Sequence, residues 1–199
     1  MSLALSVENN FIEFSGERIP LSIQKRKVRR LRLEYGPRGL TLIMPLNSTC
    51  KIDEVLSPHK RWILKRESER MEACRRVISG DIRVRKNPEA LREHIKTLTQ
   101  KAQEALGVKV SRITVRNMKT RWGSMGPKKS MNISSWTACL PDNLIRYIVY
   151  HELAHIIQPN HGSEFYKIIG KFFPDLKDID KELKIYFFAA GMLAERGDL

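Results

Sequence analysis

Two histidines lie four residues apart in the run His151-Glu152-Leu153-Ala154-His155. On a helix this spacing puts both imidazoles on one face, one turn apart, so that both can reach one ion. Zinc binds neutral imidazole nitrogens, and a catalytic zinc keeps one coordination position open for water. Glu152 would project near that open position, where a carboxylate can take a proton from the water. The run therefore predicts a zinc site with His151 and His155 as ligands and Glu152 as the general base of a hydrolysis.

A third histidine, His161, follows the pair after a break in the helical pattern. Pro159 is expected to end the helix, and Asn160 can turn the chain back toward the metal. His161 is thus the predicted third zinc ligand, and the alternative is a surface residue or a helix N-cap. Zincins with the same interval between histidines have a glycine where this chain has Gln158, and no Met-turn is evident, so the metzincin group is disfavoured.

Several helices are expected around these residues. Pro141-Asp142-Asn143 should open the helix that carries the histidine pair, and the residues around Pro159 should end it. An earlier helix should begin at Asn87-Pro88, with Asn87 as N-cap, and end at Gly107. Two shorter helices are predicted at about residues 163–172 and 176–194.

The strands are expected in two groups. Near the histidines, residues 110–116 and 130–140 read as strands that should form a hairpin beside the zinc helix. Toward the N-terminus, apolar and polar residues alternate on both sides of a Gly-Pro-Arg-Gly turn, which predicts a hairpin over residues 31–45. A weaker alternation over residues 7–24, with a turn at Ser15-Gly16, suggests another hairpin before it.

A charged helix is predicted from about residue 52 to residue 77, followed by a connector. We therefore expect an α+β protein with a basic, strand-rich N-terminal lobe at residues 1–87. A catalytic lobe with the histidine helix and a small sheet should follow at residues 88–199.

The net charge of +14 is unevenly distributed. Residues 1–129 contain 29 Lys and Arg against 13 Asp and Glu, whereas residues 130–199 contain 7 against 9. Six cations lie within eight positions: Lys25, Arg26, Lys27, Arg29, Arg30 and Arg32. On a regular strand they would alternate between two faces. Such a surface attracts an anionic partner, most plausibly nucleic acid, and the alternative is a contribution to solubility only.

The cysteines and the N-terminus indicate the compartment. Cys50, Cys74 and Cys139 form no CxxC pair, so that reduced thiols are expected. The N-terminus has no basic region ahead of an apolar run, and no apolar run approaches the ~20 residues that span a bilayer. These features predict a cytoplasmic protein without a membrane span.

Several motifs together resemble a known family, the YgjP-like zinc metallopeptidases, which are related to the SprT-like group. The motifs are Arg121-Trp122-Gly123-Ser124, Tyr150 before the histidine run, Asn160-His161, Phe165 and Pro174-Asp175. The resemblance implies a minimal zincin fold, Zn²⁺ on three histidines, a glutamate base and a protein or peptide substrate. The family usually has a cysteine where this chain has Met125, which argues against a required thiol ligand here.

Other residues are candidates for substrate binding. Trp122 and Gly123 could line the cleft beside an edge strand, or Trp122 could anchor the core and Gly123 form a bulge. Tyr166 is a further predicted substrate contact. Together with Tyr147 and Tyr150, it could also donate a hydrogen bond to an oxyanion.

The sequence therefore predicts a zinc metallopeptidase. One alternative is a zinc hydrolase of non-peptide amides, which would share every catalytic residue. Another is a nucleic-acid-associated binding protein with a structural zinc site. Glu152 disfavours the latter, because a structural site needs a fourth ligand and no base.

Overall fold

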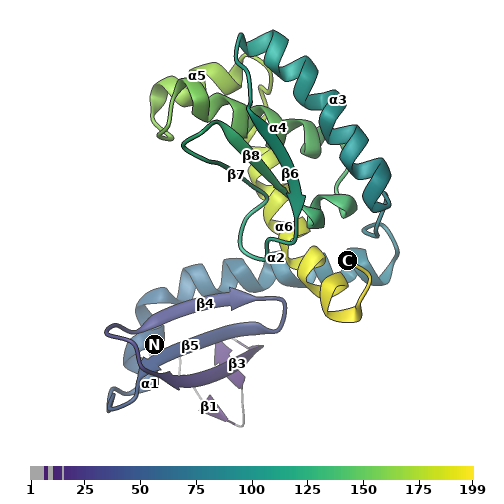
Figure 1. The fold of residues 1–199 in the computed structure, drawn as a ribbon. Helices are drawn as coiled ribbons and strands as arrows, with labels where there is room; N and C mark the ends of the chain where they lie inside the picture. Colours follow the sequence, from purple (N-terminus) through teal and green to yellow (C-terminus); the bar gives the residue numbers. More distant parts are fainter. Residues whose placement is uncertain (1–6, 9–10, 15) are drawn as a thin grey trace. The chain divides into compact units, whose positions relative to one another are not determined.

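The computed structural model describes residues 7–8, 11–14 and 16–199 (Figure 1). The chain forms two compact units, Met1–Arg76 and Val77–Leu199, each with its own small sheet. This arrangement confirms the α+β class. The two units meet after Arg76, whereas the predicted boundary between the lobes falls later in the chain, after residue 87. The predicted boundary therefore stays a prediction.

The first unit contains a five-stranded sheet in the order β1-β2-β3-β5-β4. Its strands are β1 (Val7–Glu8), β2 (Phe11–Phe14), β3 (Glu17–Arg26), β4 (Arg32–Gly36) and β5 (Gly39–Pro45). Antiparallel pairing of β4 with β5, and of β2 with β3, confirms both predicted hairpins, although Ser15 lies outside the described residues. β3 also pairs with β5 in parallel, which joins the two hairpins into one sheet.

The helical part of this unit differs from the single helix predicted at residues 52–77. It consists of α1 (Ile52–Leu56), a 3-10 helix at Ser57–His59 and α2 (Lys60–Ile78). The break falls at Pro58, which has no N–H to donate and whose ring crowds the preceding turn. The helices cover a buried apolar cluster whose members are Ile12, Phe14, Ile19, Leu21, Leu40, Leu42, Met44, Leu56 and Ile63.

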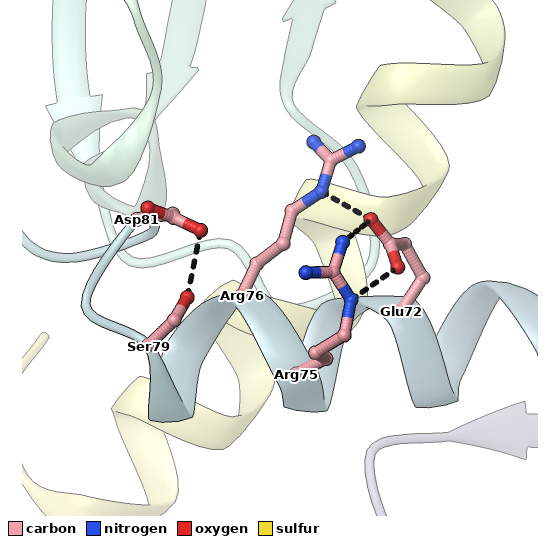
Figure 2. Close-up of polar contacts among 5 residues, drawn as sticks. All are labelled: Glu72, Arg75, Arg76, Ser79 and Asp81. Atoms are coloured by element: carbon pink, nitrogen blue, oxygen red, sulfur yellow. Dashed lines mark hydrogen bonds and ion pairs between the residues drawn. The ribbon is translucent and has the colours of Figure 1, made fainter.

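Arginines of α2 are neutralised by acids of the same helix. Arg70 makes two hydrogen bonds, of 2.6 and 2.7 Å, to the buried carboxylate of Glu67. Figure 2 shows the same pattern one turn later, where Glu72 accepts hydrogen bonds from Arg75 and Arg76. Those bonds lower the pKa of Glu72 to about 2. The charges of these arginines are therefore largely balanced within α2.

The six cations between Lys25 and Arg32 are in a different situation. β3 ends at Arg26, and the chain bends before β4 begins at Arg32, with the Val28 N–H donating to the Arg26 carbonyl at 2.9 Å. The regular two-face alternation expected for a strand is therefore wrong beyond Arg26. All six side chains are exposed, and none forms an ion pair with an acid in the described part of the chain.

The helices of the second unit begin and end at the predicted signals. α3 (Pro88–Leu106) is capped by Asn87, whose side-chain oxygen accepts from the Ala90 N–H at 2.8 Å, and it ends at Gly107 with a left-handed φ of 66°. The other helices are α4 (Asp142–Ile157), α5 (Ser163–Gly170) and α6 (Leu176–Arg196). All four predicted helices of this unit are confirmed.

The second sheet has the order β6-β8-β7, from β6 (Arg112–Arg116), β7 (Gly123–Met125) and β8 (Ser130–Ser134). The predicted hairpin of β6 with the strand after residue 130 is wrong, because β6 pairs with β8 in parallel. The hairpin partner of β8 is β7, a three-residue strand that the sequence pattern did not reveal.

The strand predicted to run to residue 140 also ends early, at Ser134. A 3-10 helix over Ser135–Cys139 follows it. The Ser134 hydroxyl caps this helix by accepting from the Trp136 N–H at 3.2 Å. Thr137 then donates its hydroxyl hydrogen to the Ser134 carbonyl at 2.7 Å.

Helix α4 lies at the centre of this unit. It packs against α3, α5, β7 and β8, and Figure 1 shows it behind the sheet. Leu144, Ile145, Ile148, Val149 and Leu153 are buried along it, so that the helix is fixed from several sides. A helix held in this way is a rigid base for side chains that must keep a set geometry.

Two predictions about sulfur and membranes can be compared with the structure. The three cysteines are free thiols, at exposed, half-buried and buried positions respectively. Among the described residues, no helix has both the length and the apolar character that crossing a membrane requires.

Candidate metal centre

The three histidines predicted as ligands lie together. His151 and His155 come from one face of α4, one turn apart. After α4 ends at Ile157, the chain turns through Asn160, whose carbonyl accepts from the Gly162 N–H at 2.9 Å. This turn places His161 between α4 and α5 and brings its ring back to the pair.

The nitrogen atoms are spaced as ligands of one ion. One ligand atom from each imidazole lies within 4.8 Å of the other two. The Nε2 atoms of His151 and His161 are 3.0 Å apart, a contact that needs a proton or a cation between two nitrogens. Two imidazoles on one tetrahedral zinc, with Zn–N bonds of about 2.05 Å, would have nitrogens about 3.3 Å apart. The His151–His161 pair thus fits one zinc ion closely, and the other nitrogen separations, all within 4.8 Å, would adjust as the ion binds.

A hydrogen bond orients one of these rings. His155 Nδ1 lies 3.3 Å from the carbonyl oxygen of Gln158. Because a carbonyl can only accept, this contact makes Nδ1 the protonated nitrogen and leaves the Nε2 lone pair for a metal. The Nδ1 atom of His151 is buried and has no hydrogen-bond partner among the described residues.

Phe165 of α5 supports all three imidazoles. Its ring is fully buried and stacks on His155, with centroids 4.8 Å apart. It also meets His151 and His161 edge to face, at 4.9 and 4.7 Å. Only its place in the family motif singled out Phe165 in the sequence. Its position four residues after His161, on a short helix, is the signal that could have assigned it this packing role.

Burial favours the neutral form of His151 and of His155. Burial first, and then the neighbouring His155 and His161, together lower the pKa of His151 to about 4. The pKa of His155 is also lowered, first by burial, although the Gln158 carbonyl opposes the shift. Neutral imidazole is the form that binds a divalent metal.

Glu152 lies beside the cluster with its carboxylate buried and only 6% of the residue exposed. Burial raises the pKa of Glu152 to about 7, while the charge of Arg121 and a hydrogen bond with the Met125 backbone act in the opposite direction. Gly123 of β7 packs directly on this carboxylate. A Cβ at position 123 would lie 2.5 Å from Oε1 and 2.7 Å from Cγ of Glu152.

The cluster opens into a cleft of about 810 Å³. Most of the segment 120–129 forms one wall, and α4 with His161 forms the other. β7 is the edge strand of its sheet, on the side that faces this cleft. A cleft with an edge strand, a histidine cluster and a buried carboxylate can accommodate an extended chain beside reactive groups.

The predicted substrate contacts lie at different places. Gly123 lines the cleft, whereas Trp122 and Tyr166 are not among its lining residues. Trp122 packs edge to face on Phe187 of α6, with centroids 5.6 Å apart, and Tyr166 is 49% exposed. Tyr147 approaches the His151 ring at 5.6 Å between centroids. Tyr150 is buried against Phe172 and Phe173.

Two solved structures of metallopeptidase zymogens are similar to part of this chain. No curated protein matched the chain. One similar solved structure is a metallopeptidase zymogen of Pyrococcus abyssi, abylysin, with 23% identity and a TM-score of 0.42, covering 45% of this chain and 90% of that one. Another is the metallopeptidase zymogen of Methanocaldococcus jannaschii, jannalysin, with 28% identity and a TM-score of 0.40, covering 46% of this chain and 92% of that one.

A family model for the YgjP-like metallopeptidase domain matches residues 85–186. The match covers just over half of the chain and includes β7, α4, α5 and all three histidines. The chain therefore belongs to the YgjP-like metallopeptidase family.

Proposed function

We propose that this chain is a zinc-dependent peptidase in which His151, His155 and His161 hold the ion and Glu152 is the general base. One observation carries the proposal: three imidazoles converge within 4.8 Å on one wall of a cleft, with the Glu152 carboxylate buried beside them. Three histidines and an open position are the donor set of catalytic rather than structural zinc. Membership of a metallopeptidase family directs the reaction to peptide bonds.

The residues of the chain have separate tasks in this proposal. A zinc ion bound to the three histidines would polarise the scissile carbonyl and make a water molecule more acidic. Glu152 would accept a proton from the attacking water and deliver it to the leaving amine. Because Gly123 has no side chain, the carboxylate of Glu152 can pack directly on β7. Phe165 and the Gln158 carbonyl keep the imidazoles in their orientation.

A hydrolysis assay on an unfolded protein tests the function. Wild type and Glu152→Gln are compared with zinc present, and cleavage is followed by mass spectrometry of the products. Products formed by the wild type alone support the proposal. Hydrolysis of simple amides with no cleavage of any polypeptide would favour the alternative of a non-peptide amidase.

We also infer a polyanion-binding role for the first unit, with nucleic acid as the partner. The six cations between Lys25 and Arg32 are exposed and without ion pairs in the described part of the chain, unlike the paired arginines of α2. Phosphate contacts made by such side chains would give affinity that depends little on base sequence and falls steeply with salt.

Charge reversal at Arg26, Arg29 and Arg30 should abolish most binding of duplex DNA at low salt. Reversal of the exposed Lys101, Lys177 and Lys181 serves as a control that changes the charge by the same amount elsewhere. Fluorescence anisotropy at two salt concentrations measures both. In the wild type the logarithm of the binding constant should fall by about 0.9 per phosphate contact for each log unit of salt. Equal binding by the two variants would leave the six cations as a solubility feature.

A further inference from the structure

The segment that forms one wall of the cleft lies within a longer stretch of the chain that contains cations and no acids. From Leu106 to Pro141 the chain contains seven Lys and Arg and no Asp or Glu. The seven are Lys109, Arg112, Arg116, Lys119, Arg121, Lys128 and Lys129. All are exposed, and none forms a salt bridge with an acid of the described residues. The field of these cations therefore remains available to a ligand, although Arg121 also acts on the buried carboxylate of Glu152.

Two of the seven, Arg121 and Lys129, line the cleft itself. Glu152 is the sole acid among the described residues that line it, and its carboxylate is buried. Arg121 precedes β7, and Lys129 ends the turn that follows β7. A chain lying in the cleft beside β7 would thus have a cation near each end of that strand.

The backbone holds Lys129 at this position despite an unfavourable conformation. Lys129 has a φ of 54°, the one left-handed value among the described residues other than glycine. Its N–H donates to the Gly126 carbonyl at 3.0 Å, and the Gly126 N–H donates to the Ser130 carbonyl at 2.8 Å, which closes the turn. Glycine or asparagine would fit this turn with less strain than lysine. Backbone strain of this kind is concentrated at functional sites, and here it lies at the rim of the cleft.

We propose that Arg121 and Lys129 form a subsite for anionic side chains, so that this peptidase selects segments with aspartate or glutamate close to the scissile bond; this rests on the proposed function. Arginine can bind a carboxylate through two parallel hydrogen bonds, and lysine adds a point charge. A concave wall of one charge sign also raises the local concentration of an oppositely charged ligand. A basic segment in the cleft would instead meet the repulsion of both cations.

Binding measurements test the subsite without requiring catalysis. The probe is a fluorescein-labelled flexible peptide rich in glutamate, with a twin in which each glutamate is glutamine. The protein is the full chain with Glu152→Gln and zinc present, so that no cleavage intervenes. The acidic peptide should bind about tenfold more tightly than its twin at low salt, and the difference should shrink as salt is added.

Matched variants locate the effect. Replacing Arg121 and Lys129 with glutamine should remove the preference for the acidic peptide. Replacing Lys119 and Lys128 with glutamine removes the same charge from the same segment but outside the cleft lining, and should keep most of the preference. Lys129→Gln alone, compared with Lys128→Gln, gives a second contrast between neighbouring exposed residues.

Each outcome has a clear meaning. Equal affinity for the two peptides, or equal losses in the cleft and control variants, would overturn the subsite. Loss of single-stranded oligonucleotide binding rather than peptide binding in the cleft variant would assign the pair to nucleic acid, and would also overturn it. The same peptides are then offered to the chain with Glu152 intact. Selective binding without cleavage would contradict the proposed peptidase and leave the subsite standing, whereas cleavage without preference would do the reverse.

Discussion

Glu152→Gln should lower the rate of peptide hydrolysis by about a hundredfold or more while the chain keeps its zinc and its fold. Glutamine has nearly the shape of glutamate but cannot accept and release a proton at neutral pH. The carboxylate is buried between α4 and Gly123, so that the amide would occupy the same space. Initial rates on a peptide substrate at saturating zinc measure the loss.

The control for this variant is a neighbouring acid that does not line the cleft. Glu164 of α5 is exposed and pairs with Lys167 in the same helix, so that Glu164→Gln should leave the rate within about twofold of the wild type. Full activity of Glu152→Gln would exclude Glu152 as the base and require another proton acceptor in the cleft.

Gly123→Ala should also cause a large loss, of about a hundredfold in kcat, with zinc content unchanged. The added methyl group would stand 2.5 Å from Oε1 and 2.8 Å from the carboxyl carbon of Glu152, so the carboxylate must move. The surroundings of Glu152 are closely packed, and a displacement of about 1 Å in a reacting group can cost two orders of magnitude in rate. Gly123 would then be a positioning residue, which acts through Glu152.

Gly162→Ala is the matched control, because Gly162 adjoins His161 but a Cβ there would meet no atom within 4 Å. Its φ of −85° also suits alanine. Steady-state kinetics should show a fall in kcat for Gly123→Ala with little change for Gly162→Ala. If Gly123→Ala has normal kcat and a raised KM, the glycine contributes to substrate binding and does not position the base.

Much of the second unit could be predicted because its signals are local. Asn87 caps the start of α3 with its side chain, and Gly107 ends α3 through its left-handed backbone conformation. The histidine helix ends at Ile157, just before Pro159. The histidine spacing carries its geometry with it, since four residues make one helical turn. His161 could be predicted as the third ligand because only a short turn separates it from α4.

The features that could not be predicted from the sequence depend on residues that lie far apart along the chain. β7 consists of Gly123, Ser124 and Met125, none of which favours strands, and it exists because β8 pairs with it. Parallel pairing of β6 with β8 depends on a connection whose path no periodicity describes. The contact between Gly123 and Glu152 joins a strand to a helix far along the chain, and only the packed structure shows it.

The zinc content of purified protein tests the central claim most directly. After dialysis against zinc at low concentration, elemental analysis of the wild type should give one zinc ion per chain. His161→Ala should lose most of it, and replacement of all three histidines should remove it, while Glu152→Gln keeps it. Stoichiometric zinc in the variant without His151, His155 and His161 would contradict the account.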